Sequence, residues 1–302
     1  MITAVTITEP VAVWLQTGSR RLRVHSVFPQ AINLVGDDSQ FLTLLAQDAD
    51  DGPFALRLAG PRLPDVPADT TGRAAHGTIF LGPLLIDWRS ATRWDPTLKP
   101  LDKTCAVPLG LLDRLHRSDS IFGLFSLTPI RVNLSRERRS SSGFSRVSRP
   151  SGLSGTRSLF HAQLTTQAAG HLATLRAGLQ DDDAALAGAV RSLLGFGEGL
   201  TPAGDDCLLG VLAARCMSGQ PAGLLEATIR ASVSRTTSLS AAFLRAACDG
   251  QFAGHWHRLR DALALGEGVE IEEAVRRILS HGATSGADAL VGWVVGLASR
   301  RA

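Results

Sequence analysis

The sequence predicts an α+β protein with two parts, a β-rich domain over residues 1–130 and an all-helical domain over residues 159–302. Short apolar runs separated by turn residues, such as 32–35 and 41–45 on either side of Gly36-Asp37-Asp38-Ser39, predict the first part. Beyond residue 160, apolar residues recur every three to four positions and predict the second. A chain of 302 residues can accommodate two domains that each bury a core.

In the first domain, five short apolar runs predict strands that form a small barrel or a sandwich. They span 11–15, 32–35, 41–45, 77–81 and 84–88. The stretch 108–116 has the apolar spacing of a short helix that closes the domain.

Residues 131–158 differ in composition from the rest of the chain. They contain serines, glycines and seven arginines, opposed only by Glu137. This composition is typical of a flexible linker or long loop. The alternative is a mobile basic segment that gathers phosphates or an acidic partner.

The second domain is expected to consist of helices. The first covers Leu164 to Leu179, and the next begins at Asp181-Asp182-Asp183 and continues to Leu193. Further helices are predicted over 202–217, 221–234, 239–249, 255–265, 269–281 and 286–299.

Composition excludes several classes of function. No lysine follows Lys103, so neither a Walker phosphate-binding loop nor a Schiff-base site fits the helical half. The four cysteines have no metal-ligand spacing, and no apolar run is long enough to cross a membrane. The net charge of +3 is too small to predict a nucleic-acid partner. We expect a cytoplasmic protein with reduced thiols.

The stretch 195–206 is the densest in chemistry, with four glycines, Thr201, Pro202 and the pair Asp205-Asp206. It lies between two apolar helical patterns, so we expect a loop followed by a helix with Thr201 as N-cap and Pro202 at the first helical position. Glycine-rich loops and helix starts can bind anions through their N–H groups. Two adjacent carboxylates then favour either a phosphate with a metal ion such as magnesium or an anion that bears an amide. Alternatively, the carboxylates only complement the helix dipole and the glycines only end the preceding helix.

A second cluster, 235–240, places Thr236, Thr237 and Ser238 before an apolar helix. These hydroxyls cap that helix or bind a carboxylate or phosphate, and the sequence leaves both readings open.

A third cluster, which begins at Thr284 and Ser285, has a sequence order similar to that of the glycine-rich stretch and the helix after it. Residues 204–210 and 286–292 share the order Gly, any residue, Asp, any residue, Leu, aliphatic, Gly. If the two helix starts converge, one pocket receives carboxylates from Asp206 and Asp288. The alternative is that Gly210 and Gly292 let two helices pack closely, while Ser285 and Asp288 form a cap.

The order Gly-x-Gly-x-Gly-Leu-Thr-Pro-x-Gly-Asp-Asp from residue 195, with Thr-Thr-x-x-Ser from 236 and Ser-Gly-x-Asp-x-Leu from 285, resembles a bacterial family. That family includes the AllH subunit of oxamate carbamoyltransferase, from allantoin degradation. The resemblance implies the exchange of a carbamoyl group between oxalurate and phosphate, in a hetero-oligomer with other carbamoyltransferase subunits. Its ligand would be a small anion such as carbamoyl phosphate or a ureide.

Motif and resemblance together define the candidate site. The expected catalytic residues are Thr201, Asp205 and Asp206, and both aspartates are candidate magnesium ligands, although no cofactor is required by the sequence. The expected substrate-binding residues are Gly197, Gly199, Gly204, Thr236, Thr237, Ser238, Thr284, Ser285 and Asp288. The alternative functions are a regulatory module that binds a small anion without chemistry and a metal-dependent amide or ureide hydrolase.

Overall fold

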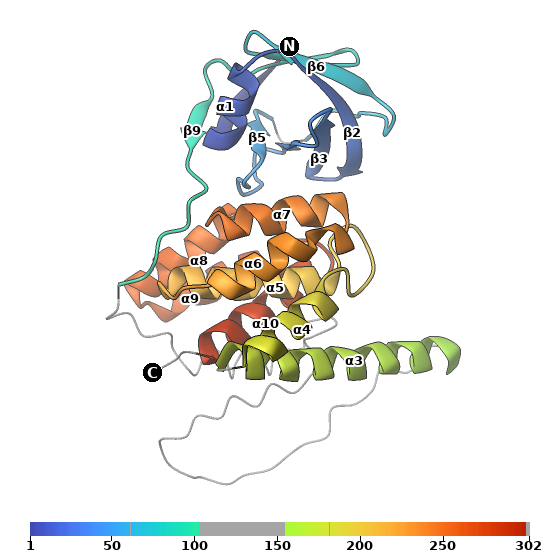
Figure 1. Ribbon diagram of the computed structural model, residues 1–302. Coiled ribbons are helices and arrows are strands. Elements are labelled where there is room, and N and C mark those ends of the chain that lie inside the picture. The colour runs from blue at the N-terminus through green and yellow to red at the C-terminus, as the bar shows by residue number, and fades with distance from the viewer. Residues whose placement is uncertain (61, 103–154, 181, 300–302) are drawn as a thin grey trace.

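The computed structural model describes residues 1–60, 62–102, 155–180 and 182–299. A β-rich part comes first and a helical part follows, as Figure 1 shows. This confirms the α+β class expected from the sequence. The helix expected over 108–116 lies outside the described residues, as does the basic stretch up to residue 154, while residues 155–158 belong to a helix.

The first part is a closed barrel of eight strands, with a ninth strand attached. In ring order the eight strands are β1 (Ile2–Thr8), β5 (Ala55–Leu58), β4 (Phe41–Leu45), β3 (Ala31–Gly36), β2 (Arg20–Phe28), β6 (Thr71–Ala75), β7 (Thr78–Leu81) and β8 (Leu84–Asp87). The ring closes because β1 pairs with both β5 and β8. The ninth strand, β9 (Thr92–Trp94), pairs in parallel with the last residues of β1, beyond the part of β1 that pairs with β8. Of the two architectures expected, the barrel is therefore the one formed.

Alternating side chains explain why these segments close into a barrel. In β2, Leu22 and Val24 are buried in the interior while Arg21 and Arg23 are exposed. A two-residue turn of His76 and Gly77, both with positive φ, joins β6 to β7.

The expected strand over 11–15 is wrong, because this segment is helix α1 (Glu9–Gln16). Val11, Ala12 and Leu15 are its buried residues, and this spacing places them on one face of a helix. Glu9 and a proline in the first turn favour a helix start at this point.

The second part is helical, as expected. Its helices are α3 (Gly155–Gln180), α4 (Asp183–Leu193), α5 (Ala203–Met217), α6 (Gly223–Ser232), the short 3₁₀ helix η1 (Val233–Arg235), α7 (Ser238–Cys248), α8 (Gly254–Leu265), α9 (Gly268–Leu279) and α10 (Ser285–Ala298). Asp182 caps α4, which begins at the aspartate run as expected, and Thr237 caps α7, which is one of the two readings that the sequence left open for this cluster. The predicted cap of α5 is wrong by one residue, because Pro202 is extended and occupies the N-cap position in place of Thr201.

Helices α5 and α10 pack with their backbones in contact at the centre of the helical part. A Cβ atom built on Gly210 would lie 1.8 Å from the carbonyl oxygen of Ala289, and one on Gly292 would lie 1.9 Å from that of Cys207. Only glycine permits such an approach. The two contacts are reciprocal, because Cys207 and Ala289 occupy equivalent places in the repeated motif.

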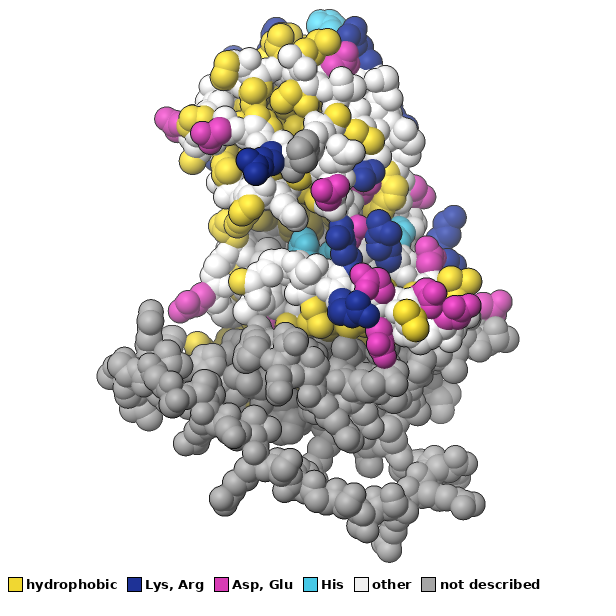
Figure 2. Space-filling model, turned by 180° about the vertical axis from the view of Figure 1, so that it is seen from behind, with side chains coloured by type: hydrophobic (Ala, Val, Ile, Leu, Met, Phe, Trp, Pro, Cys, Tyr) yellow, Lys and Arg dark blue, Asp and Glu magenta, His cyan; other side chains and the backbone are white. Residues whose placement is uncertain are grey.

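The barrel and the helical part meet along a seam centred on residues 48–54. Asp50, nearly buried, accepts from Arg258 Nε at 3.0 Å and from Arg277 Nε at 2.9 Å. The carbonyl of Asp51 accepts from the N–H of Gly254 at 2.7 Å. Figure 2 shows basic and acidic side chains gathered on one face at the level where the two parts meet. These contacts fix the barrel over the ends of α8 and α9.

The glycine contacts generate a stability prediction. Gly292→Ala adds a methyl group where the carbonyl of Cys207 lies, so α5 and α10 must separate. We expect a loss of about 1–3 kcal/mol in the free energy of unfolding, measured by chemical denaturation. The matched control is Gly188→Ala in α4, where no atom lies within 4 Å of the added carbon. This control should be neutral or stabilising, since alanine favours helix. Equal stability of the two variants would contradict the packing argument.

Candidate functional site

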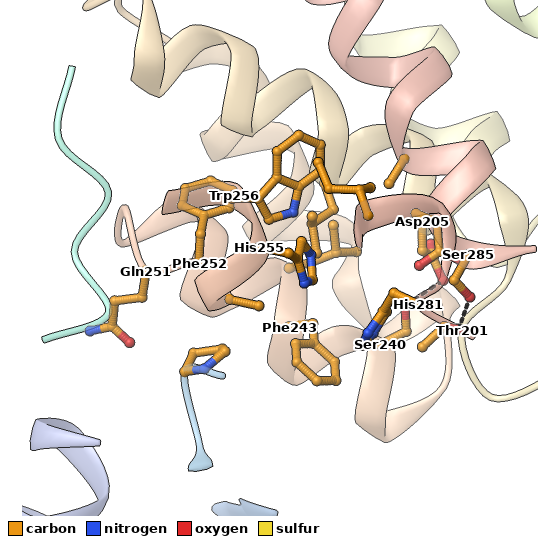
Figure 3. Close-up of a pocket in the computed structure, with 18 residues that line it drawn as sticks. Thr201, Asp205, Ser240, Phe243, Gln251, Phe252, His255, Trp256, His281 and Ser285 are labelled. Atoms are coloured by element: carbon orange, nitrogen blue, oxygen red, sulfur yellow. Dashed lines mark hydrogen bonds between the residues drawn. The ribbon is translucent and has the colours of Figure 1, made fainter. Parts of the chain in front are cut away.

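A cavity of about 70 Å³ lies where the starts of α5 and α10 meet α7, α8 and the barrel. It has room for several water molecules or a small ligand. Figure 3 shows aromatic side chains at one end of it and hydroxyl and carboxylate groups at the other. The barrel contributes Pro53, and the other lining residues are Thr201, Asp205, Asp206, Leu209, Ser240, Phe243, Leu244, Gln251, Phe252, Ala253, His255, Trp256, Ile278, His281, Ser285, Gly286 and Ala289.

The two helix starts that resemble each other in sequence converge at this cavity. The hydroxyl oxygens of Thr201, before α5, and Ser285, at the start of α10, are 3.0 Å apart and share a hydrogen bond (Figure 3). Burial raises the pKa of Asp206, and the charge of the nearby carboxyl group of Asp288 adds to this. The two helix starts thus lie together at the cavity and their glycines pack closely, so the convergence hypothesis and its packing alternative describe the same arrangement. Asp206 lines the cavity, but Asp288 does not.

Asp205 is the hub of a hydrogen-bond network that orders the loop before α5. Its carboxylate accepts from the N–H of Gly195 at 3.0 Å, from Ser240 Oγ at 2.8 Å and from the hydroxyl of Thr236. Burial raises the pKa of Asp205, while the hydrogen bonds from Thr236, Gly195 and Ser240 act in the opposite direction. The side chain thus connects the glycine loop with the start of α7.

Asp206 differs from its neighbour, because part of its carboxyl group has no partner. The side chain is 8% exposed, and its Oδ2 makes no hydrogen bond with any residue that the structure describes. Burial raises the pKa of Asp206 well above its usual range, and the charges of Asp288 and Asp205 add to this, although hydrogen bonds from Ser285 and Thr201 oppose it. A carboxyl group in this state holds a proton more readily than usual, and can then both donate and accept.

The predicted loop glycines allow the backbone conformation of the loop and do not line the cavity. Gly197 and Gly199 have φ values of 113° and 93°, and neither residue lines the cavity. Gly204 packs against Leu193 and donates its N–H to the carbonyl of Phe196 at 2.8 Å. That N–H group, expected to hold an anion, is therefore already used within the loop.

The hydroxyls of the second cluster also have partners within the protein. Thr237 Oγ1 accepts from the N–H of Ser240 at 3.1 Å and donates to the carbonyl of Leu200 at 2.5 Å. Ser238 Oγ lies 3.1 Å from Nε2 of His25 in the barrel. Together with the bond from Thr236 to Asp205, these contacts favour the capping and positioning reading of the cluster.

In the third cluster, only Ser285 of the three predicted residues lines the cavity. Thr284 is the N-cap residue of α10, but its side chain makes no capping hydrogen bond. The alternative reading, a cap formed by Ser285 and Asp288, does not fit, because Thr284 occupies the N-cap position. Asp288 is fully buried behind the cavity wall.

Two histidines line the cavity that the sequence did not single out. The rings of His255 and His281 are 4.9 Å apart, and they come from α8 and from the segment after α9. Burial, together with the neighbouring His281, lowers the pKa of His255 to about 3, so its imidazole is neutral near pH 7. No lysine or arginine is among the described residues that line the cavity. No local spacing links the two histidines, so the sequence carries no signal for the pair.

The predicted magnesium site at Asp205 and Asp206 stays a prediction. Within the described ranges, no group of three or more His, Cys, Asp or Glu side chains is arranged to hold a metal ion. The same ranges contain no helix that is long and apolar enough to span a membrane.

Comparison with known families gives two matches. Residues 193–297 match the family described as oxamate carbamoyltransferase subunit AllH, and residues 3–93 match the AllH family N-terminal domain. No solved structure matches the chain. The first match spans the loop before α5, all of α5 and the start of α10, and the second covers the barrel. With both halves of the fold matched in order, the chain belongs to the AllH family.

Proposed function

We propose that this chain is a subunit of a carbamoyl-transferring enzyme and that its cavity binds the carbamoyl group of the substrate. The family description names a subunit of oxamate carbamoyltransferase, which supports an enzyme assembled from different chains. The observation that carries the proposal is the carboxyl group of Asp206, buried at the cavity with one oxygen that has no partner among the described residues.

A carbamoyl group offers a carbonyl oxygen and an NH₂ group side by side. A protonated carboxyl group presents the complementary pair, an O–H donor and a carbonyl acceptor. The raised pKa of Asp206 favours this protonated form. Asp206 would therefore bind the primary amide through two hydrogen bonds, and a ligand without the amide would leave a buried polar atom unsatisfied.

The hydroxyls of Thr201 and Ser285 stand beside this carboxyl group. In carbamoyl transfer, the carbonyl oxygen gains negative charge as a nucleophile attacks the carbon. When substrate binds, these hydroxyls would turn from each other and from Asp206 and donate to that oxygen, which would stabilise its charge. In this proposal the hydroxyls take the role that the sequence suggested for the loop N–H groups. Asp205, which accepts three hydrogen bonds, would act as a positioning residue.

The cavity offers few groups that could bind the phosphate of the substrate. Among the described lining residues only His255 and His281 can take a positive charge. A phosphate normally binds to arginine, lysine or free backbone N–H groups. We therefore infer that the phosphate is held largely by residues of a partner subunit, which agrees with an enzyme whose site is complete only in the assembly.

Ligand binding tests the role of Asp206. Asp206→Leu should weaken binding of oxamate by about tenfold or more, because it removes both hydrogen-bonding atoms. Asp206→Asn keeps one donor and one acceptor and should stay within about threefold of the natural protein. Calorimetric titration of the assembled subunits would measure both, with oxalate as the ligand that lacks the amide. Asp183→Leu, at the exposed start of α4, is the matched control. Equal affinity for oxamate and oxalate, or full binding by Asp206→Leu, would count against the proposal.

The raised pKa of Asp206 also predicts how stability depends on pH. Between the lower pKa of the unfolded chain and the raised pKa of the native state, the native state binds more protons, so the free energy of unfolding falls as pH rises. Asp206→Asn has no such group. Its melting temperature relative to the natural protein should therefore be higher at pH 8 than at pH 5, with each pKa unit worth about 1.4 kcal/mol. Thermal unfolding across this pH range provides the measurement, and a difference that does not vary with pH would refute the assignment.

A further inference from the structure

The outer surface of the barrel carries a row of side chains that neither the cavity nor the helical part uses. The strand pairings place Arg21 of β2 opposite Arg73 of β6, Arg73 opposite Phe80 of β7, and Phe80 opposite Leu85 of β8. All four residues are exposed, and Arg23 lies two residues along β2 on the same face. We call Arg21, Arg23, Arg73, Phe80 and Leu85 the barrel row.

The arginines of the barrel row have no acidic partner within the part of the chain that the structure describes. None of the three forms an ion pair with any residue that the structure describes. Arg21 and Arg73 face each other directly across an antiparallel pair, and like charges in that position destabilise a sheet. The fold alone gives no reason for this arrangement, whereas a negatively charged surface laid over the row would neutralise it.

The row also exposes apolar area beside the charge. Phe80 and Leu85 are each 41% exposed, and the guanidinium of Arg73 lies 5.8 Å from the centre of the Phe80 ring. Arginine and aromatic side chains are enriched at the centre of protein interfaces, and Leu85 adds apolar area beside them. A nucleic acid would complement the arginines but not Leu85.

The position of the row leaves it open to another molecule. Figure 1 shows β6 at the end of the barrel that faces away from the helices. The barrel contacts the helices around residues 48–54 and at His25, farther along β2 than Arg21 and Arg23.

We propose that the barrel row is a docking surface for an acidic, partly apolar surface of a partner subunit. This rests on the proposed function, since it is that function which requires a partner chain. The row then attaches the barrel to the partner, while the helical part presents its cavity.

Charge reversal tests the row without disturbing the fold. Arg21→Glu turns the repulsion opposite Arg73 into attraction, so this variant should melt about 1–3 °C above the natural protein. It should nevertheless bind its partner at least tenfold more weakly, and Arg21→Glu with Arg73→Glu should abolish binding. Arg62→Glu, an exposed arginine in a loop of the barrel, is the matched control and should bind normally.

The measurement is co-purification and calorimetric titration with the other subunits of the cognate carbamoyltransferase, at low and high salt. Normal assembly by the double variant would overturn the docking surface and leave the proposed function intact. Failure of the natural protein to bind these subunits under any condition would overturn both. Binding of a DNA duplex or an RNA by the natural protein, lost in the double variant, would also overturn the proposal, because the row would then serve a nucleic acid.

Discussion

The helical half depends on the close packing of α5 against α10. The carbonyl oxygen of Ala289 fills the space that a side chain at position 210 would need, and that of Cys207 does the same at position 292. Because the two contacts are reciprocal, α5 and α10 are related in the manner of a two-fold pair within one chain. This arrangement brings both helix starts to the same place. Thr201 then meets Ser285, and Asp206 meets Asp288.

The same contact has an electrostatic cost. Two carboxyl groups that lie close together in a buried place cannot both be charged without a penalty. Burial raises the pKa of Asp206, and the charge of Asp288 adds to this. Such a pair adds nothing to the stability of the fold. In the proposed site, a carboxyl group that keeps its proton can both donate to and accept from the amide of the substrate. The chemistry proposed for the cavity is therefore linked to the packing that creates it.

Much of this architecture could be predicted from the sequence, and the part that could not has a physical reason. Periodicity predicted the helices, and the repeated motif suggested that two helix starts either converge or pack closely through their glycines. Helix α1 was missed because a short apolar run fits a strand as well as a helix. His255, His281 and Pro53 were missed because they come from separate segments that only the fold brings together. Thr236 and Ser238 were candidates for ligand binding or for capping, and their hydroxyls contact Asp205 and His25. A sequence alone does not distinguish a hydroxyl that binds substrate from one that orders a loop.

The wall that Pro53 contributes to the cavity has a consequence for how the chain can be divided. The two family matches separate the barrel from the helical half, as if each were a module. The cavity includes residues of both halves, since Pro53 of the β4–β5 connection is part of its lining. The neighbouring Asp50 and Asp51 attach this connection to the helical half. A helical half produced without the barrel would keep every residue of its motifs and still lack the part of the cavity wall that Pro53 forms. The cavity as described is therefore formed by both halves of the chain together.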